Sequence, residues 1–169
     1  MPAKANALNI SRQFTESGKD PFDELSWSKR DVEIRNFDGS IAFSMKDVNL
    51  PDNYSQVAAN VLAQKYLRKA GIPKKLRKIK EKAVPSWLQR SVPDLKSMED
   101  LNEDDKFGEE VDGKQTFRRL AGTWTYWGWK YGYFASEEDA KAYFDEMCYM
   151  LASQMVAPNS PQWLSLIHI

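Results

Sequence analysis

The most regular alternation of apolar and polar residues lies between residues 30 and 48. The runs DVEIRNF and SIAFSMKDV place apolar side chains at near-alternate positions, which is typical of strands with one buried face. Asp38-Gly39 lies between them, and this dipeptide favours a tight turn because glycine adopts positive φ without strain. The pattern predicts a β-hairpin over about residues 30–48.

A helical period replaces this alternation after the hairpin. Between residues 54 and 70 apolar residues recur at near-helical spacing, and Asn53 or Ser55 can cap the first turn. Gly71 and Pro73 follow, and this combination ends helices because glycine tolerates a left-handed backbone and proline lacks an N–H donor. We therefore expect a helix near residues 54–70.

The last third of the chain predicts two longer helices, near residues 115–131 and 136–156. The first carries the aromatic run GTWTYWGWKYGYF. The second begins at Ser136, a natural N-cap followed three residues later by Asp139, and Pro158 marks its end. We expect the two helices to pack through their aromatic faces.

The remaining segments are polar. Residues 1–20 predict a flexible N-terminal arm, and residues 21–163 predict a single domain. Within this domain a basic block passes into an acidic one, which predicts an irregular charged excursion over about residues 73–114. The expected fold class is α+β, mainly helical, with an N-terminal β-hairpin.

Composition narrows the functional classes. The 169 residues carry 24 basic and 24 acidic side chains, so no overall field draws the protein toward nucleic acid or an anionic membrane. No apolar run approaches the roughly 18 residues of a membrane span, and the N-terminus lacks a signal-peptide pattern. The single cysteine cannot form an internal disulfide. We expect a soluble, cytoplasmic protein that binds neither nucleic acid nor a membrane.

Two segments keep alternative functions open. The block KKLRKIKEKAVPSWLQR either binds phosphates, with Trp87 as a stacking platform, or forms a solvated face whose field the following MEDLNEDD cancels. The aromatic run is either core packing or a surface that further protein covers, since its glycines permit close approach of another element. A nucleic-acid binder and a non-enzymatic interaction module with a Trp-rich surface are therefore alternatives.

Two potentially reactive side chains receive no catalytic role. Cys148 lies in a predicted helix beside Met147 and Tyr149, and no positive neighbour in the sequence lowers its pKa. We interpret it as a small buried hydrophobe. His168, the only histidine, has no visible partner. The sequence thus assigns no catalytic or metal-ligating residue.

The segment APNSPQW has a more specific pattern. Pro158 and Pro161 bracket Asn159 and Ser160, which leaves a hydroxyl, an amide and backbone N–H groups in a short rigid turn. Such a turn can hydrogen-bond a phosphate or a sugar hydroxyl. It can equally be a simple helix stop, in which the polar side chains satisfy terminal backbone groups.

Four segments carry a family resemblance: EIRNFDGSIAFSMKDVNLP, YSQVAANVLAQKYLRKAGIP, RRLAGTWTYWGWKYGYF and EEDAKAYFDEMCYMLASQMVAPNSPQW. In this order and spacing they resemble the N-terminal region of the class II, adenosylcobalamin-dependent ribonucleotide reductases, over about residues 11–163. The combination of GTWTYWGWK with APNSPQW is the most specific part of the resemblance.

The resemblance implies a reaction and an architecture. Such ribonucleoside-diphosphate reductases are oxidoreductases that convert ribonucleotides to 2′-deoxyribonucleotides for DNA synthesis. Adenosylcobalamin generates a thiyl radical on a cysteine, and a cysteine pair supplies the reducing equivalents. A helical N-terminal region precedes a ten-stranded α/β barrel in the family. The expected partners are the ribonucleotide substrate and the remainder of the reductase chain.

The resemblance also assigns the candidate site. The family's Asn-Ser-Pro turn lies at the mouth of the active site, so Ser160 is expected to bind the substrate nucleotide and Asn159 to support the turn. The catalytic and shuttle cysteines lie downstream in the family, and Cys148 matches none of them. No residue of this chain can be assigned to adenosylcobalamin. The chain alone is therefore expected to be inactive.

The end of the sequence departs from the family pattern. After Trp163 the run LSLIHI does not resemble the family's continuation into the barrel. We interpret residues 164–169 as a non-native tail that follows a truncation before the barrel.

Overall fold

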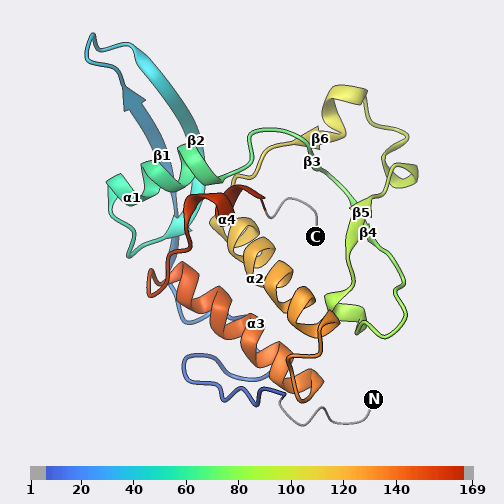
Figure 1. Cartoon of the computed structure of the whole chain (residues 1–169). Helices are drawn as coiled ribbons and strands as arrows, with labels where there is room; N and C mark the ends of the chain where they lie inside the picture. Colours follow the sequence, from blue (N-terminus) through green and yellow to red (C-terminus); the bar gives the residue numbers. More distant parts are fainter. Residues whose placement is uncertain (1–6, 166–169) are drawn as a thin grey trace.

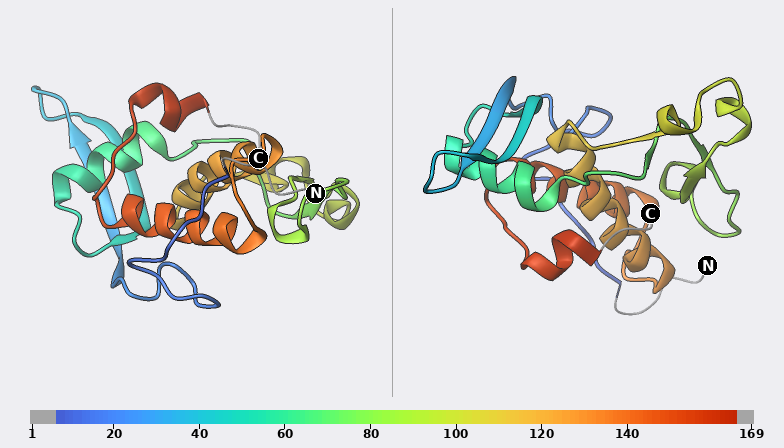
Figure 2. Two further views of the ribbon diagram at one scale, coloured as in Figure 1. Left: turned by 60° about the horizontal axis from the view of Figure 1, so that its bottom comes forward. Right: turned by 90° about the horizontal axis from the view of Figure 1, so that it is seen from above.

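Two long helices form the body of the molecule. The structure is a computed structural model, and it describes residues 7–165. Helix α2 (Gly113–Lys130) and helix α3 (Glu137–Ala152) lie side by side and antiparallel, joined by a short connection (Figure 1). A β-hairpin and an irregular excursion extend from them in different directions (Figure 2). Among the helices of these described residues, none is both long and apolar enough to cross a membrane.

The predicted hairpin is confirmed and is longer than expected. Strand β1 (Trp27–Arg35) pairs antiparallel with β2 (Ile41–Pro51), and Gly39 in the turn between them has a φ of +85°. Val32 and Met45 are register partners, and both are buried on the inner face. The alternation in the sequence therefore corresponds to a sheet with one buried face. Two irregularities of register interrupt the pairing, which bends such a ribbon locally.

The helix after the hairpin is shorter than predicted and changes its hydrogen-bond period. Ser55 caps α1 (Gln56–Val61) through its side chain. The chain continues as a π-helix, η1 (Leu62–Tyr66), and Leu67 donates its N–H to the carbonyl five residues earlier at 3.1 Å. Leu67 itself is extended, so the helical segment does not fill residues 54–70. The wider π turn is a feature that the apolar spacing did not indicate.

Side-chain caps fix where both long helices begin. Asp112 and Gln115 form a reciprocal capping box at the start of α2, and the Asp112 carboxylate accepts a backbone N–H at 2.8 Å. Ser136 caps α3 by accepting the N–H of Asp139 at 3.1 Å, as the sequence predicted. Both predicted helices are present, although α3 ends at Ala152 rather than near residue 156.

The main core lies between the inner face of the hairpin, the α1/η1 segment and the facing sides of α2 and α3. Its largest fully buried side chains come from the segment before β1, the hairpin, α2 and α3: Phe22, Val32, Val48, Leu50, Phe117, Leu120 and Leu151. Glycines of α2 meet rings on or beside α3. A Cβ at Gly122 would lie 3.8 Å from the ring of Phe144, and one at Gly128 only 2.7 Å from the ring of Phe134.

The excursion contains short elements only. These are β3 (Ile72–Pro73), β4 (Leu76–Lys78), η2 (Ser86–Leu88), β5 (Ser91–Pro93), η3 (Lys96–Met98), η4 (Glu103–Asp105) and β6 (Phe107–Gly108). Strand β3 pairs with β6 and β4 with β5, both antiparallel. Over the described residues, 37% are helical and 21% lie in strands. The α+β class is therefore confirmed, but the description "mainly helical" is wrong because much of the chain is strand, turn and irregular backbone.

The N-terminal arm is anchored along α3. The guanidinium of Arg12 donates to the Asp145 carboxylate at 2.6 Å. The buried Glu146 carboxylate accepts the backbone N–H groups of Phe14 and Thr15 at 2.9 to 3.2 Å. Leu8 forms a parallel bridge with the segment that connects α2 to α3. The polar composition of residues 1–20 gave no sign of these contacts.

Candidate functional site

The segment APNSPQW forms the start of a short helix, α4 (Ser160–Ser165). The backbone carbonyl of Asn159 accepts N–H groups from Gln162 at 2.9 Å and from Trp163 at 3.4 Å. The indole N–H of Trp163 donates to the carbonyl of Pro158 at 2.8 Å. These bonds close the segment on itself, so the hydroxyl of Ser160 is carried by a defined turn.

The hydroxyl of Ser160 lies 3.0 Å from the phenol oxygen of Tyr66, and either oxygen can be the donor. Tyr66 is the last residue of η1, and its ring stacks on that of Trp163 with 4.9 Å between centroids and 25° between planes. Trp163 is buried, whereas Ser160 is exposed. The turn thus has an apolar anchor beneath it and presents two hydroxyls at its surface.

A buried ion pair supports this anchor from below. Arg119 of α2 contacts Glu110 through two hydrogen bonds of 3.0 Å and donates to the carbonyl of Trp163 at 3.2 Å. Burial alone raises the pKa of Glu110. The hydrogen bonds and charge of Arg119, with the N–H of Arg68 and the hydroxyl of Thr116, outweigh burial and hold that pKa below its usual value. The carboxylate is therefore charged at neutral pH.

The two predicted site residues differ in what they contribute. Ser160 presents its side-chain hydroxyl at the surface of the turn. Asn159 supports the turn through its backbone carbonyl, which any residue at that position would supply. The amide side chain of Asn159 is exposed beside the hydroxyl of its neighbour. The structure brings the two residues together on one surface, and their role toward a ligand stays a prediction.

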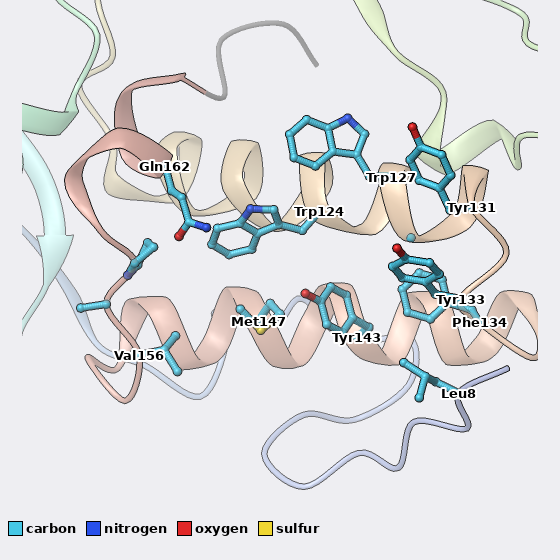
Figure 3. A pocket seen from close by; sticks show the side chains of 13 residues that line it. Leu8, Trp124, Trp127, Tyr131, Tyr133, Phe134, Tyr143, Met147, Val156 and Gln162 are labelled. Atoms are coloured by element: carbon cyan, nitrogen blue, oxygen red, sulfur yellow. The ribbon is translucent and has the colours of Figure 1, made fainter. Parts of the chain in front are cut away.

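A groove of about 810 Å³ opens beside the turn, between α2 and α3 (Figure 3). Pro158 and Gln162 from the turn line one part of it, and Leu8 from the arm lines another. The walls between them are mostly aromatic: Trp124, Trp127, Tyr133, Phe134 and Tyr143. The aromatic run of the sequence is therefore split between the core and an open surface.

Cys148 is 0% exposed, which confirms the prediction that it is a small buried hydrophobe. Burial raises the pKa of its thiol well above the ordinary value, which removes the reactive thiolate. A cobalamin-dependent radical reaction needs an accessible thiol, and the sequence holds no other cysteine. Cys148 therefore does not supply such a thiol. His168 lies outside the described residues.

Trp87 is engaged by other side chains. Its indole N–H donates to Glu137 at 3.0 Å, and its ring meets that of Phe144 edge-on with 5.9 Å between centroids. Lys78 of the basic block donates to the carbonyls of Ser86 and Trp87, at 2.7 Å each. Trp87 is half-buried and packs against α3 within the chain, and the nucleic-acid alternative stays a prediction.

The sequence did not predict three residues that hold the turn at Ser160 in place: Tyr66, Arg119 and Glu110. Arg119 carried a usable signal, because it falls three residues after Thr116 and four before Thr123 on a helical face that proves buried. An arginine on such a face requires a buried partner. Its partner could not be identified, since the sequence offers Glu109 and Glu110 equally.

Comparison with known proteins agrees with the resemblance. The family model described as class II vitamin B12-dependent ribonucleotide reductase matches residues 28–154. Proteins named vitamin B12-dependent ribonucleotide reductase are similar over most of the chain. The one from Agrobacterium fabrum is 53% identical over 94% of this chain, the one from Bradyrhizobium diazoefficiens 51% over 94%, and the one from Streptomyces avermitilis 32% over 96%.

The match covers only part of each relative. It spans 12% of the Agrobacterium protein, 13% of the Bradyrhizobium protein and 14% of the Streptomyces protein. The chain therefore corresponds to a small region of a much longer enzyme, and the matched family model spans most of this chain's helices and its hairpin. On these matches, the chain belongs to the class II vitamin B12-dependent ribonucleotide reductase family.

Proposed function

We propose that this chain is the N-terminal region of an adenosylcobalamin-dependent ribonucleotide reductase and that it supplies part of the substrate site. The turn at Asn159 and Ser160 presents a hydroxyl to the phosphate or sugar oxygens of the ribonucleotide. The whole enzyme reduces ribonucleotides to 2′-deoxyribonucleotides. This region contributes binding and orientation rather than a reacting group.

The observation that carries the proposal is the exposed hydroxyl pair of Ser160 and Tyr66, 3.0 Å apart. One hydroxyl can donate to the other while the second donates outward to a ligand oxygen. The stacked ring of Trp163 and the buried Arg119–Glu110 pair hold this arrangement in place. A site fixed in this way needs little reorganisation when an anion binds.

We also propose that this region is inactive alone. Adenosylcobalamin, when bound by the full-length enzyme, supplies the radical that initiates reduction. The only cysteine here, Cys148, is completely buried, so neither a substrate nor a dithiol reductant can reach its sulfur. What remains for this chain's side chains is to hold and orient the nucleotide.

The test is Ser160→Ala in a full-length reductase that carries this region. Loss of one hydrogen bond to a charged oxygen costs about 1.5–3 kcal/mol, which corresponds to roughly a 10- to 100-fold fall in kcat/KM. Steady-state kinetics with ribonucleotide substrates measures it. Tyr66→Phe removes only the supporting hydroxyl, so a smaller fall is expected.

Ser40→Ala is the matched control, because this exposed serine lies in the hairpin turn. It should leave the kinetics unchanged. If Ser160→Ala behaves like Ser40→Ala, then Ser160 does not bind substrate. Asn159→Ala removes the side-chain amide and keeps the backbone carbonyl. If the kinetics of this variant are unchanged, Asn159 only supports the turn.

A further inference from the structure

One guanidinium lies beneath both halves of the proposed site. Arg119 donates to the carbonyl of Trp163 at 3.2 Å and to the carbonyl of Tyr66 at 3.3 Å. The rings of Trp163 and Tyr66 stack, and the Tyr66 hydroxyl lies 3.0 Å from that of Ser160. The same side chain of α2 therefore binds the backbone of η1 and of α4, the two elements that carry the exposed hydroxyl pair.

The carbonyl of Tyr66 needs a donor from outside its own helix. Tyr66 is the last residue of η1, and Leu67 after it has an extended backbone. The last carbonyl groups of a helix have no N–H partner within that helix, so a side chain or water must serve them. Arg119 serves this one. The contact fixes the backbone at the point where the Tyr66 side chain begins.

Arg119 is itself held in one orientation. Its Nε and Nη2 atoms donate to the two carboxylate oxygens of Glu110 at 3.0 Å each. Glu110 in turn accepts the N–H of Arg68 and the hydroxyl of Thr116, also at 3.0 Å each. A planar guanidinium bound by two such bonds cannot rotate freely, so its remaining donors point in a defined direction. The Glu110 carboxylate thus aims Arg119 at the two carbonyls.

We propose that Arg119 is the positioning residue of the Tyr66–Ser160 hydroxyl pair. The inference rests on the proposed function for its kinetic consequence, because those hydroxyls are the groups that meet the ribonucleotide there. The Arg119 side chain is only 6% exposed, so it acts through the backbone carbonyls and not by touching the substrate. A buried ion pair is often no more stabilising than apolar residues of similar volume, so a role in placing the turn accounts better for its presence.

The first experiment replaces Arg119 by lysine in a full-length reductase that carries this region. Arg119→Lys keeps the charge beside Glu110, but one ammonium group cannot reproduce the planar fork that reaches a carboxylate and two carbonyls together. Misplacing a binding group by about 1 Å can lower kcat/KM by up to about 100-fold, and we expect such a fall, mainly through a higher KM. Amide exchange at Gln162 and Trp163, which bond the Asn159 carbonyl, should also accelerate.

Arg30→Lys is the matched control. Arg30 likewise donates to two backbone carbonyls, those of Pro51 and Tyr54, but it lies in the hairpin. This variant should leave both the kinetics and the amide exchange in α4 unchanged. Exchange in α4 that is the same in Arg119→Lys and the wild type would overturn the inference, whatever the kinetics.

A second variant separates positioning from stability. Glu110→Leu with Arg119→Met leaves no charge unpaired, so its melting temperature should lie close to that of the wild type. It still lacks the donors to both carbonyls, so we expect the lower kcat/KM and the faster exchange of Arg119→Lys. A stable double variant with wild-type kinetics and exchange would show that Arg119 is only structural and would contradict the inference.

The dependence on Ser160 distinguishes the two proposals. When Ser160→Ala is already present, Arg119→Lys should lower kcat/KM by no more than about 2-fold, because both changes act on one contact. An equal fall in both backgrounds would show that Arg119 acts elsewhere, which also overturns the inference. If Ser160→Ala alone has no kinetic effect but Arg119→Lys still accelerates exchange in α4, the substrate-binding proposal fails and the positioning of the turn by Arg119 stands.

Discussion

Arg119 and Glu110 form a buried ion pair whose two hydrogen bonds are both 3.0 Å long, and the same guanidinium donates to the carbonyl of Trp163. The side chains are only 6% and 4% exposed. A single arginine thus connects the carboxylate that precedes α2 to the turn that carries Ser160. The position of the candidate site depends on an electrostatic contact that lies beneath it.

Removing one partner of this pair should destabilise the fold strongly. Glu110→Ala leaves the guanidinium of Arg119 buried without its counter-charge, and such changes cost about 3–5 kcal/mol. The shift of the urea unfolding midpoint of the chain measures this cost. Replacing both residues, Glu110→Leu with Arg119→Met, should recover most of the loss because no charge is then left unpaired.

An exposed pair provides the control for that experiment. Arg35 and Glu33 lie 2.7 Å apart in the hairpin, with side chains 56% and 42% exposed. Because water screens such a pair, Arg35→Ala should cost no more than about 1 kcal/mol. Equal losses at the buried and exposed pairs would contradict the importance assigned to the buried one.

Acid should weaken the fold through Glu110. Its pKa in the folded chain lies below the ordinary value of 4.5, because Arg119 and its other partners outweigh burial. A lowered folded pKa gives stability that is present above the unfolded pKa and is lost as pH falls through the folded one. Urea titrations of the wild type and Glu110→Gln should therefore differ most at neutral pH. Their difference should shrink below about pH 4.

Two glycines of α2 should respond oppositely to alanine. Gly122→Ala meets nothing closer than 3.8 Å and gains helix propensity, so it should stabilise by up to about 1 kcal/mol. Gly128→Ala places its Cβ 2.7 Å from Phe134, and the overpacking should cost about 1–3 kcal/mol. Thermal unfolding compares the two variants. Equal stabilisation would show that the Phe134 ring moves aside freely.

A single substitution that removes the charge of Glu146 should weaken the attachment of the N-terminal arm to α3. Glu146→Gln keeps the shape of the side chain but removes the charge that accepts the N–H groups of Phe14 and Thr15. Hydrogen exchange at these two amides should accelerate several-fold, because charged acceptors make the stronger bonds. Lys19→Ala, which removes an exposed pair with Glu16, should leave exchange there unchanged. Protection that survives Glu146→Gln would assign the anchoring to the Arg12–Asp145 pair instead.

Features encoded within a few residues could be predicted from the sequence. The hairpin turn at Gly39 and the cap at Ser136 each depend on local backbone chemistry, and both occur where expected. The prolines that flank Asn159 and Ser160 predicted a turn there, and the chain turns at these residues into α4. These features need no information about distant parts of the chain.

Features made by distant pairs could not be predicted. Arg119 meets the Trp163 carbonyl across 44 residues, and Arg12 meets Asp145 across 133. Several acidic residues were equally suitable partners for Arg12, and a backbone carbonyl such as that of Trp163 leaves no signal in the sequence. The π-helical end of the first helix had no signal either, because Tyr66 and its neighbours fit an ordinary helical period equally well.

The anchoring of the arm on α3 also dictates an order of assembly. Ile10 bonds Asp139 across 129 residues, so these contacts close one of the longest loops in the chain. Ile10 is synthesised before Asp139, so the arm waits for its partners until α3 has been made and packed on α2. Contacts of such long range form late because their loop-closure entropy is lost before they contribute. The arm is made before α3 and is nevertheless expected to be among the last segments to settle.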